Sequence, residues 1–332
     1  MPGPPRPAPD DPGPASGPDH GPGHRRSDPG PPARRRVRGD GVDLSVAEWG
    51  TPGPGPTTVL VHGYPDSSTV WHPVVAALRA GDPARHVVAP DVRGAGRSDH
   101  PRPVRAYRLP RLVADLVAVL EATSPGRPAH LVGHDWGSVQ SWAAVADPQA
   151  ATRIASFTSL SGPPLELAGA WARARLRPHP ADLRALARQA ARSSYVGALL
   201  VPGLGPAAWR LGLGRAWPRL QRQREGVATD ADWPGPGLVD DAVAGVGLYR
   251  ANLGPGAPRT PGAPARVPVQ VLVLEDDAFL TPSLFEGIGT LSPGARLRRV
   301  EGGHWAIRRH PDRVASWIDD HIAASSGPGT GR

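Results

Sequence analysis

Apolar and polar positions change their spacing in a regular order through the first half of the chain. A segment that alternates on either side of Gly41 suggests a hairpin of two strands. The apolar runs that begin at Thr57 and His86 show no alternation, which is typical of parallel strands buried on both faces. Residues 109–124 carry apolar side chains at helical spacing. This alternation of strand and helix predicts a doubly wound, mostly parallel α/β sheet.

The pattern changes at about residue 165 and returns after residue 254. Between these points the chain is helical, rich in Arg and broken by Pro and Gly. Strand-like runs reappear at 267–282 and 297–311, followed by a final helix. An insertion between two halves of one sheet explains this order. We therefore predict five segments: a disordered tail (1–36), the first half of an α/β core (37–164), a helical insertion (165–254), the second half of the core (255–324) and a flexible tail (325–332).

Composition narrows the chemistry and the compartment. The chain has no Cys, which excludes disulfides, a thiol nucleophile and Cys-ligated zinc. The N-terminus lacks the apolar core of a signal peptide, and no run of 18 apolar residues appears, although 195–214 comes nearest. We therefore expect a cytoplasmic protein without a membrane span.

The net charge of +8 is unevenly placed along the chain. Residues 171–225 hold eleven Arg against Asp182 and Glu225, a local net charge of +9. Such a surface attracts anionic lipid or an acidic substrate. The simpler alternative is a solvated helix face in an Arg-biased sequence, since the chain contains no Lys. No nucleic-acid partner is expected, and the oligomeric state is left open.

The segment HLVGHDWGSVQSW (130–142) organises the candidate chemistry. It reads as strand, sharp turn and helix, and Gly133 and Gly137 flank Asp135 at the spacing of a nucleophile elbow, G-x-Nu-x-G. The usual nucleophile at the centre is Ser. An Asp carboxylate instead attacks an electrophilic sp3 carbon and forms an ester with it. A chance turn is the alternative for this motif alone.

Other motifs agree with this turn. His62-Gly63-Tyr64-Pro65 follows the third predicted strand, and the segment DVRGAGRSD (91–99) follows the fourth. Asp277 and His304 each follow a late apolar strand, in the order nucleophile, acid, base. Together these features resemble the α/β-hydrolase fold, and within it the epoxide hydrolase and haloalkane dehalogenase branch. The resemblance covers about residues 37–324, and the 165–254 insertion matches the helical cap of that family.

The resemblance implies roles for the matching residues. Asp135 is the nucleophile, His304 is the base that activates water, and Asp277 holds the imidazole in its useful tautomer. Glu275 and Asp276 are rivals of Asp277. We prefer Asp277 because D-A-F-L matches the family's stretch after its acid, although the usual Gly three residues earlier is replaced by Leu274.

The backbone N–H groups of Tyr64 and Trp136 are expected to form the oxyanion hole. Six further polar residues near these motifs are interpreted as structural supports rather than chemical participants: His62, Asp91, Arg93, Asp99, His134 and His310.

Two cap tyrosines decide between the two activities of the branch. Epoxide hydrolases place two cap Tyr side chains against the ring oxygen, and Tyr195 and Tyr249 fall at matching places, Tyr195 seven residues before Pro202. Opening an epoxide generates an alkoxide that needs a proton, and Tyr, with an unperturbed pKa near ~10, supplies it. Either Tyr is alternatively an ordinary half-buried residue.

A halide leaves as a stable anion and needs only weak N–H donors. Trp136 offers one, but the position of Tyr64 lacks the Asn or Trp that many dehalogenases place after His-Gly. We therefore expect an epoxide hydrolase that takes a small hydrophobic epoxide and uses no cofactor and no metal. A haloalkane dehalogenase-like hydrolase and a catalytically silent binding protein are the alternatives.

A closer resemblance is to the hydrolase half of actinobacterial-type proteins in which a short-chain dehydrogenase follows. The segments HDWGSV (134–139) and ASFTSLSGP (155–163) match that group. No dinucleotide-binding domain is seen in the 332 residues, so no nicotinamide cofactor is expected.

Overall fold

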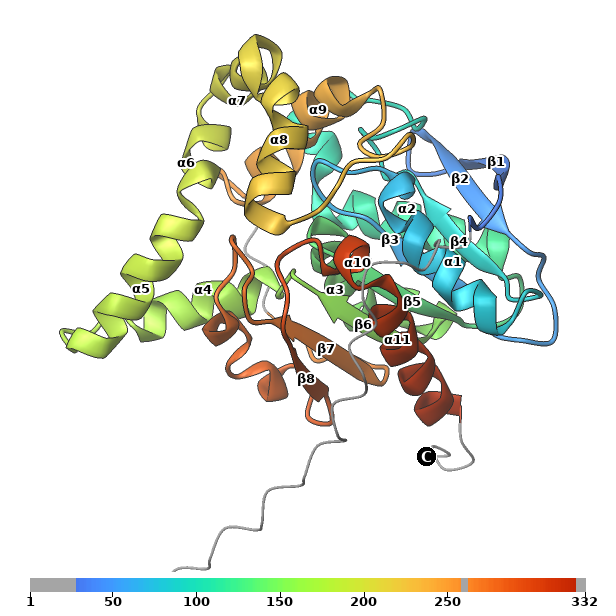
Figure 1. Cartoon of the computed structure of the whole chain (residues 1–332). Coiled ribbons are helices and arrows are strands. Elements are labelled where there is room, and N and C mark those ends of the chain that lie inside the picture. The colour runs from blue at the N-terminus through green and yellow to red at the C-terminus, as the bar shows by residue number, and fades with distance from the viewer. Residues whose placement is uncertain (1–27, 258–261, 327–332) are drawn as a thin grey trace, which may run out of the picture.

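The computed structural model describes residues 28–257 and 262–326, and a single eight-stranded sheet runs through its centre (Figure 1). The strand order is β1-β2-β4-β3-β5-β6-β7-β8. The strands β4, β3, β5, β6, β7 and β8 pair in parallel. At one edge of the sheet, β2 pairs antiparallel with β4, and β1 pairs antiparallel with β2. The mostly parallel α/β sheet predicted from the sequence is confirmed. The strand bounds are β1 Ala33–Arg38, β2 Asp43–Trp49, β3 Thr58–Val61, β4 Val87–Pro90, β5 Ala129–His134, β6 Ile154–Leu160, β7 Val269–Leu274 and β8 Arg296–Val300.

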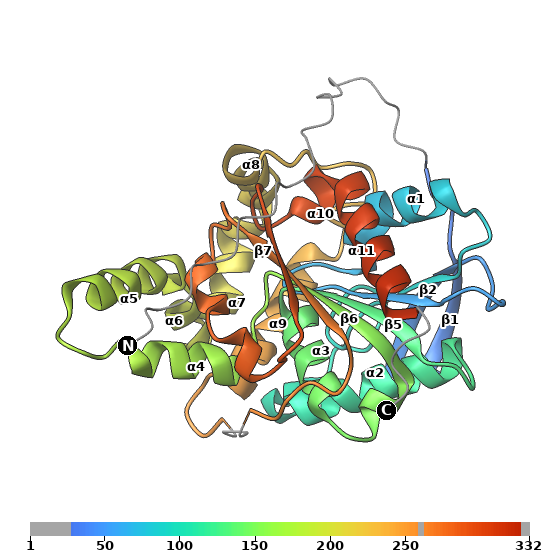
Figure 2. The same ribbon diagram turned by 90° about the horizontal axis from the view of Figure 1, so that it is seen from below.

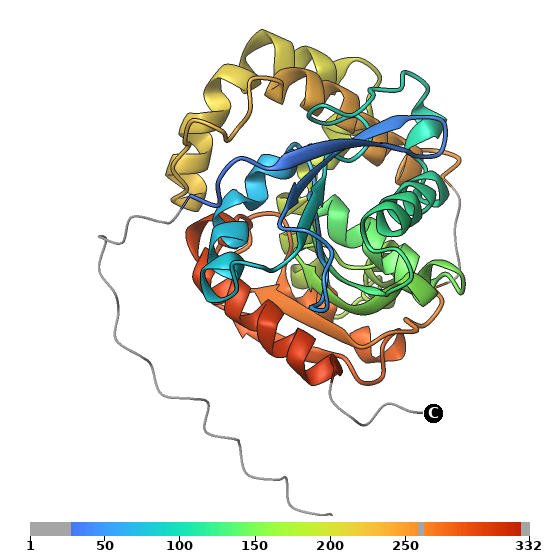
Figure 3. The ribbon, with the colours of Figure 1, turned by 90° about the vertical axis from the view of Figure 1, so that its right-hand side faces the viewer.

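Helices cover both faces of this sheet, as Figure 3 shows. Helices α1 (His72–Gly81) and α11 (Pro311–Ser326) pack together on one face. Helices α2 (Leu109–Thr123) and α3 (Trp136–Ala146) lie on the other. Every residue of β3 and β4 is buried, which is why these strands are apolar without alternation.

Short 3-10 turns complete the core. They are Ser68–Trp71, Val104–Tyr107, Ala150–Arg153, Pro282–Phe285 and Ile288–Thr290, and a four-residue helix, α10 (Ala306–Arg309), precedes α11.

The ends of the ordered core differ from the predicted boundaries. The tail was expected to reach residue 36, but β1 already begins at Ala33. An edge strand needs little apolar burial when its backbone pairs with a neighbour, and here only Val37 is buried while Arg35 forms an ion pair with Glu48. The second tail was expected from residue 325, but α11 continues through Ser326. The remainder of both predicted tails, 1–27 and 327–332, lies outside the described residues.

The inserted segment consists of helices joined by loops, with no strand among its described residues. Its helices form a layer beside the core in Figure 1, and Figure 2 shows α4 and α5 projecting to one side of the sheet. The bounds are α4 Leu165–Ala174, α5 Pro180–Arg192, α6 Ser194–Leu200, α7 Leu204–Ala208, a π-helical turn Trp209–Leu213, α8 Gly214–Glu225 and α9 Leu238–Asn252. We call residues 165–252 the cap.

No single helix in the described parts of the chain is both long and apolar enough to cross a membrane. The segments Ser194–Leu200 and Leu204–Glu225, which meet at 106°, satisfy length and composition only when they are taken as a pair.

Candidate active site

Asp135 lies at the sharp turn between β5 and α3. Its backbone has φ 53° and ψ −123°, a strained conformation for a residue with a side chain. The two flanking glycines make this turn possible. A Cβ on Gly133 would lie 2.6 Å from the carbonyl oxygen of Gly137, and one on Gly137 would overlap the backbone of Val61. The G-x-Nu-x-G spacing read from the sequence therefore has a steric cause.

Backbone N–H groups hold the carboxylate of Asp135. The N–H of Tyr64, in the loop after β3, donates to Oδ1 at 2.7 Å, and the N–H of Trp136 also donates to this carboxylate. Burial raises the pKa of Asp135 to about 6, while the positive charge of His304 and these two N–H groups act in the opposite direction. The side chain is therefore mostly ionised at neutral pH and aimed into the site.

His304 lies between two carboxylates. Its Nδ1 is 3.0 Å from Oδ2 of Asp277, and its Nε2 is 3.8 Å from Oδ2 of Asp135. Burial alone would lower the pKa of His304, but the charge and hydrogen bond of Asp277, together with the charge of Asp135, raise it to about 9. The imidazole is thus oriented by one acid and faces the other.

Burial separates Asp277 from its two sequence rivals. Asp277 is 2% exposed, and its Oδ1 accepts the N–H groups of Phe279 and Leu280 at 2.8 and 3.1 Å. Its burial would raise the pKa of the carboxyl, but His304 and the N–H of Phe279 lower it below its ordinary value. Glu275 and Asp276 are exposed.

Neither rival lies against the histidine. Glu275 faces Arg299 at 3.5 Å, and Asp276 accepts the N–H of Gly302 at 3.3 Å. Among the three acids, only Asp277 contacts His304 within the described structure.

A cavity of about 290 Å³ lies between the core and the cap, and both predicted cap tyrosines line it. Tyr195 comes from α6 and Tyr249 from α9. Their rings pack edge to face with their centroids 6.0 Å apart, and their hydroxyl groups interact. Burial and the negative charge of Asp135 raise the pKa of both tyrosines well above its ordinary value, so both stay protonated. The other lining residues are Tyr64, Asp135, Ala198, Leu199, Leu204, Gly205, Ala208, Trp209, Leu213, Trp217, Leu220, Gln221, Arg224, Glu225, Phe279, His304 and Trp305.

Asp66 is a buried residue of the site that sequence reasoning missed. Its two carboxylate oxygens accept the indole N–H groups of Trp233, from the cap, and Trp305, beside His304, at 2.7 and 2.9 Å. It therefore ties the cap to the segment that carries the histidine. Its position two residues after Tyr64 was the available signal, but nothing in the sequence connects it to Trp233.

Two cap residues also reach the catalytic loops. Arg192, at the end of α5, donates to the carbonyl oxygens of Asp277 and Leu280 at 2.8 and 3.2 Å. Glu225, at the end of α8, is 7% exposed, lies against Gly303 and faces the N–H of His304. Its negative charge adds to the forces that raise the pKa of His304. The Arg-rich pattern of these helices does not distinguish Arg192, which binds the core, from an Arg that points into solvent.

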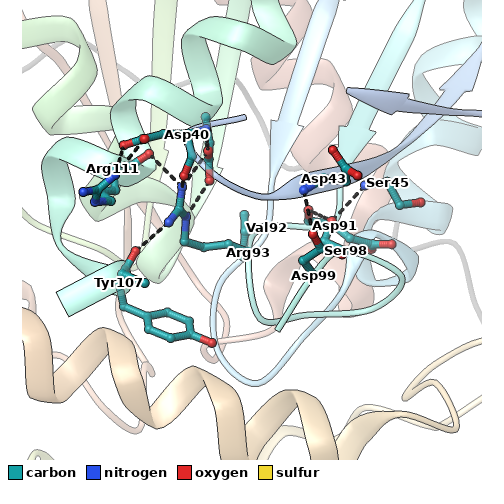
Figure 4. A network of polar contacts seen from close by, with 12 residues as sticks. Asp40, Asp43, Ser45, Asp91, Val92, Arg93, Ser98, Asp99, Tyr107 and Arg111 are labelled. Carbon is teal, nitrogen blue, oxygen red and sulfur yellow. Dashed lines mark hydrogen bonds and ion pairs between the residues drawn. The ribbon is translucent and has the colours of Figure 1, made fainter. Parts of the chain in front are cut away.

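The polar residues interpreted as supports do hold the loops. Figure 4 shows Arg93 among backbone carbonyls and Asp99 receiving the N–H of Asp43, at 2.8 Å. The guanidinium of Arg93 also pairs with Asp115 at 2.6 Å, and Asp91 accepts the N–H of Ser68 at 2.8 Å.

Histidine side chains support the same loops. Nε2 of His62 accepts the N–H of Val92 at 3.0 Å, and Nε2 of His134 donates to the carbonyl of His304 at 2.9 Å. Over residues 28–257 and 262–326, no group of three or more His, Asp or Glu side chains is placed to hold a metal ion.

A known family model matches part of this chain. Residues 56–195 match the family model described as alpha/beta hydrolase fold. The sheet order, the strained Asp135 turn and the inserted cap agree with that match. The chain has the α/β-hydrolase fold.

Known relatives of this α/β hydrolase include mycobacterial proteins. A protein of Mycobacterium tuberculosis named "Probable oxidoreductase EphD" is 33% identical over 294 residues, which cover 87% of this hydrolase and 49% of EphD. "Epoxide hydrolase A" of the same organism is 43% identical over 136 residues, or 41% of this hydrolase and 40% of that protein. This hydrolase therefore spans about half the length of EphD.

A solved structure gives the same fold. An epoxide hydrolase from Bacillus megaterium superimposes with a TM-score of 0.69 at 19% identity, covering 87% of this hydrolase and 100% of that chain. At this level of identity the similarity concerns the fold alone. The curated relatives make this chain an epoxide hydrolase-like α/β hydrolase.

Proposed function

We propose that this α/β hydrolase opens an epoxide to a vicinal diol through an ester on Asp135. The observation that carries the proposal is the pair Tyr195 and Tyr249, whose protonated hydroxyl groups share one cavity with the carboxylate of Asp135. A nucleophile on one side and two hydroxyl donors on the cap side suit a three-membered ring that must be attacked at carbon while its oxygen receives a proton.

The reaction divides into two steps. In the first, an oxygen of Asp135 forms a bond to an epoxide carbon, the ring C–O bond breaks, and a tyrosine proton neutralises the alkoxide. In the second, His304 takes a proton from water, and the resulting hydroxide attacks the ester carbonyl carbon of Asp135. The N–H groups of Tyr64 and Trp136 stabilise the oxyanion that forms. The ester C–O bond then breaks, and the departing alkoxide takes the proton that His304 removed from water, which completes the diol. The carboxyl proton left on Asp135 returns to the deprotonated tyrosine, so that Asp135 is regenerated as a carboxylate and both tyrosines are protonated again.

Haloalkane dehalogenation is the rival reaction, and it needs free N–H donors for a halide. The indole of Trp209 already donates to the hydroxyl of Tyr64 at 2.6 Å. The ring of Trp136 packs against Tyr249 at 5.0 Å and does not line the cavity. Trp217 keeps an indole N–H without an acceptor in the described structure, so the rival retains one donor.

The cavity favours an apolar substrate. Aromatic and aliphatic side chains form most of its wall, and a site of this kind binds ligands chiefly through apolar burial. The Bacillus megaterium relative forms a complex with its product (R)-3-[1]naphthyloxy-propane-1,2-diol. We accordingly propose small hydrophobic epoxides with alkyl or aryl substituents as the substrate class.

A panel of such epoxides and matched 1-haloalkanes tests the proposal. Diol formation that is lost in Asp135→Ala, without halide release from the haloalkanes, is the expected result. Halide release without diol formation would assign the dehalogenase activity instead. Absence of turnover on the whole panel would favour the catalytically silent alternative.

A further inference from the structure

The corner between α6 and α8 exposes large apolar side chains. Val201, Leu204 and Leu211 are 49%, 49% and 81% exposed. They come from the turn before α7, from α7 itself and from the π-helical turn after it, and α7 forms the outer margin of the cap in Figure 1. We call residues 201–215 the cap corner. Grouped exposed apolar side chains are characteristic of interaction surfaces.

The segment that forms the cap corner and its flanking helices carries charge of one sign, while the exposed Asp240 of α9 lines a surface pocket together with Pro206 of the corner. Residues 183–224 contain eight Arg and no Asp or Glu. Arg210 and Arg215, which flank Leu211, are exposed, and neither forms an ion pair with any of the described residues. If two copies of the chain met through this corner, the Arg side chains of one copy would face those of the other. This repulsion disfavours a symmetric dimer. The surface instead suits a partner that is both apolar and anionic.

Exposed residues of the same corner also line the catalytic cavity, which places an opening of the cavity there in the proposal that follows. Leu204 and Ala208 are exposed at the surface and also line the cavity, as does the exposed Arg224. Molecules that enter the cavity past these residues therefore cross the apolar, cationic surface. Hydrophobic molecules dissolve preferentially in the apolar interior of a bilayer.

We propose that the cap corner docks on an anionic lipid bilayer, with Leu211 inserted among the headgroups and the cavity mouth facing the lipid. Apolar side chains surrounded by Arg are the composition of segments that lie in a membrane interface rather than across it. The supply of substrate from the lipid rests on the proposed epoxide hydrolysis. The docking itself does not.

Vesicle flotation tests the docking without any turnover measurement. The chain is expected to float with phosphatidylcholine vesicles that contain phosphatidylglycerol, more weakly at high salt, and not with phosphatidylcholine alone. Removing one charge near a lipid surface lowers partitioning about fivefold, so Arg210→Gln with Arg215→Gln should lower it roughly 25-fold. Arg105→Gln, at an exposed position of the core, is the matched control.

A single label locates the inserted side. The chain has no Cys, so Leu211→Cys carries one environment-sensitive dye, and Leu297→Cys, at a 50% exposed position on β8, is its control. The dye at 211 should shift to the blue on anionic vesicles, and the dye at 297 should not. Absence of flotation, or equal shifts at both positions, would overturn the proposal.

Two further outcomes separate this inference from its alternatives. A lipid-free dimer that Val201→Ser with Leu211→Ser dissociates would assign the corner to a second copy of the chain and overturn lipid docking. A chain that floats as described but opens no epoxide would contradict the proposed function and the supply of substrate from lipid, while the docking result would stand.

Discussion

Nε2 of His304 lies 3.8 Å from the nearer carboxylate oxygen of Asp135, too far for an ordinary hydrogen bond. The two groups still interact through their charges. Asp135 helps to raise the pKa of His304 to about 9, and His304 favours the ionised form of Asp135. In the proposed reaction Asp135 becomes an ester and loses its charge, so the pKa of His304 must fall. The first step would thus prepare the base for the second.

This division of labour predicts different fates for two variants. In His304→Gln the nucleophile remains while the base is lost, so an epoxide should alkylate Asp135 and the ester should accumulate. In Asp135→Ala no ester should form. Intact-mass spectrometry after incubation with a verified substrate reads both results. The assigned roles would be wrong if neither variant gained the mass of the substrate.

The electrostatic interaction between Asp135 and His304 also predicts how the rate of alkylation depends on pH. Asp135 is a nucleophile only when ionised, and its pKa is raised to about 6, so alkylation should slow as pH falls through about 6. Asp135→Asn resembles the ester in charge and should lower the pKa of His304 below about 9.

NMR titration of His304 in the wild type and in Asp135→Asn measures this change in pKa. The His304→Gln variant identifies the signal of His304. Besides Asp135, three carboxylates face the ring or lie near it, from Asp277, Glu225 and Asp66, and a neutral His134 packs at 4.7 Å. An unchanged pKa in Asp135→Asn would mean that these groups control the base and that the nucleophile does not.

The choice of triad acid is testable between adjacent residues. Asp277→Asn removes the charge that orients His304, and loss of a triad acid with geometry preserved costs about 10⁴ in rate. Asp276→Asn is the matched control, because Asp276 is exposed and its carboxylate accepts the N–H of Gly302 rather than contacting His304. Diol formation by the two variants under the same conditions makes the comparison. A larger loss of diol formation in Asp276→Asn would assign the role of triad acid to Asp276 instead.

The ester route also predicts where water oxygen goes. Hydroxide attacks the carbonyl carbon of the ester, so a single turnover in ¹⁸O-water should place label in Asp135 and little in the first diol. Peptide mass spectrometry of the segment around Asp135 and analysis of the diol measure both. Label that appears directly in the first diol would show that water attacks the epoxide carbon.

The core of this site could be predicted from the sequence because its causes are local. Gly133 and Gly137 are required by the turn that holds Asp135, so their spacing marks the position of the candidate nucleophile. Asp277 follows the buried strand β7 and His304 follows its parallel neighbour β8, and parallel strands bring such residues to one edge of the sheet. Asp276 and Asp277 were harder to separate, because burial depends on the loop that folds around them.

The contacts between cap and core could not be predicted in the same way. Asp66 meets Trp233 across 167 residues of sequence, and no periodicity connects them. Arg192 reads as one more Arg of a polar helix face, yet it binds the carbonyl of Asp277. The early start of β1 at Ala33 was also missed, since pairing with β2 stabilises an Arg-rich strand that has little to bury.

The last prediction concerns Tyr195 and Tyr249, which separate epoxide hydrolysis from dehalogenation. Each change to Phe removes one hydroxyl donor while keeping the ring and its packing, and loss of one such preorganised donor costs about 10²–10³ in rate. The surviving Tyr should make single variants milder, and the double variant should be nearly inactive. The loss should fall on alkylation, so no ester should accumulate, unlike in His304→Gln.

Tyr107→Phe is the matched control for this pair. The hydroxyl of Tyr107 is buried away from the cavity, so its removal should leave diol formation intact. A dehalogenase would tolerate the double change as well, because a departing halide needs no proton. Rapid-quench measurement of ester and diol in the wild type, the double Phe variant and Tyr107→Phe tests whether the two cap tyrosines donate the proton. Epoxide turnover at the wild-type rate in the double Phe variant would exclude the tyrosines as proton donors, and with them the reason for preferring an epoxide over a haloalkane.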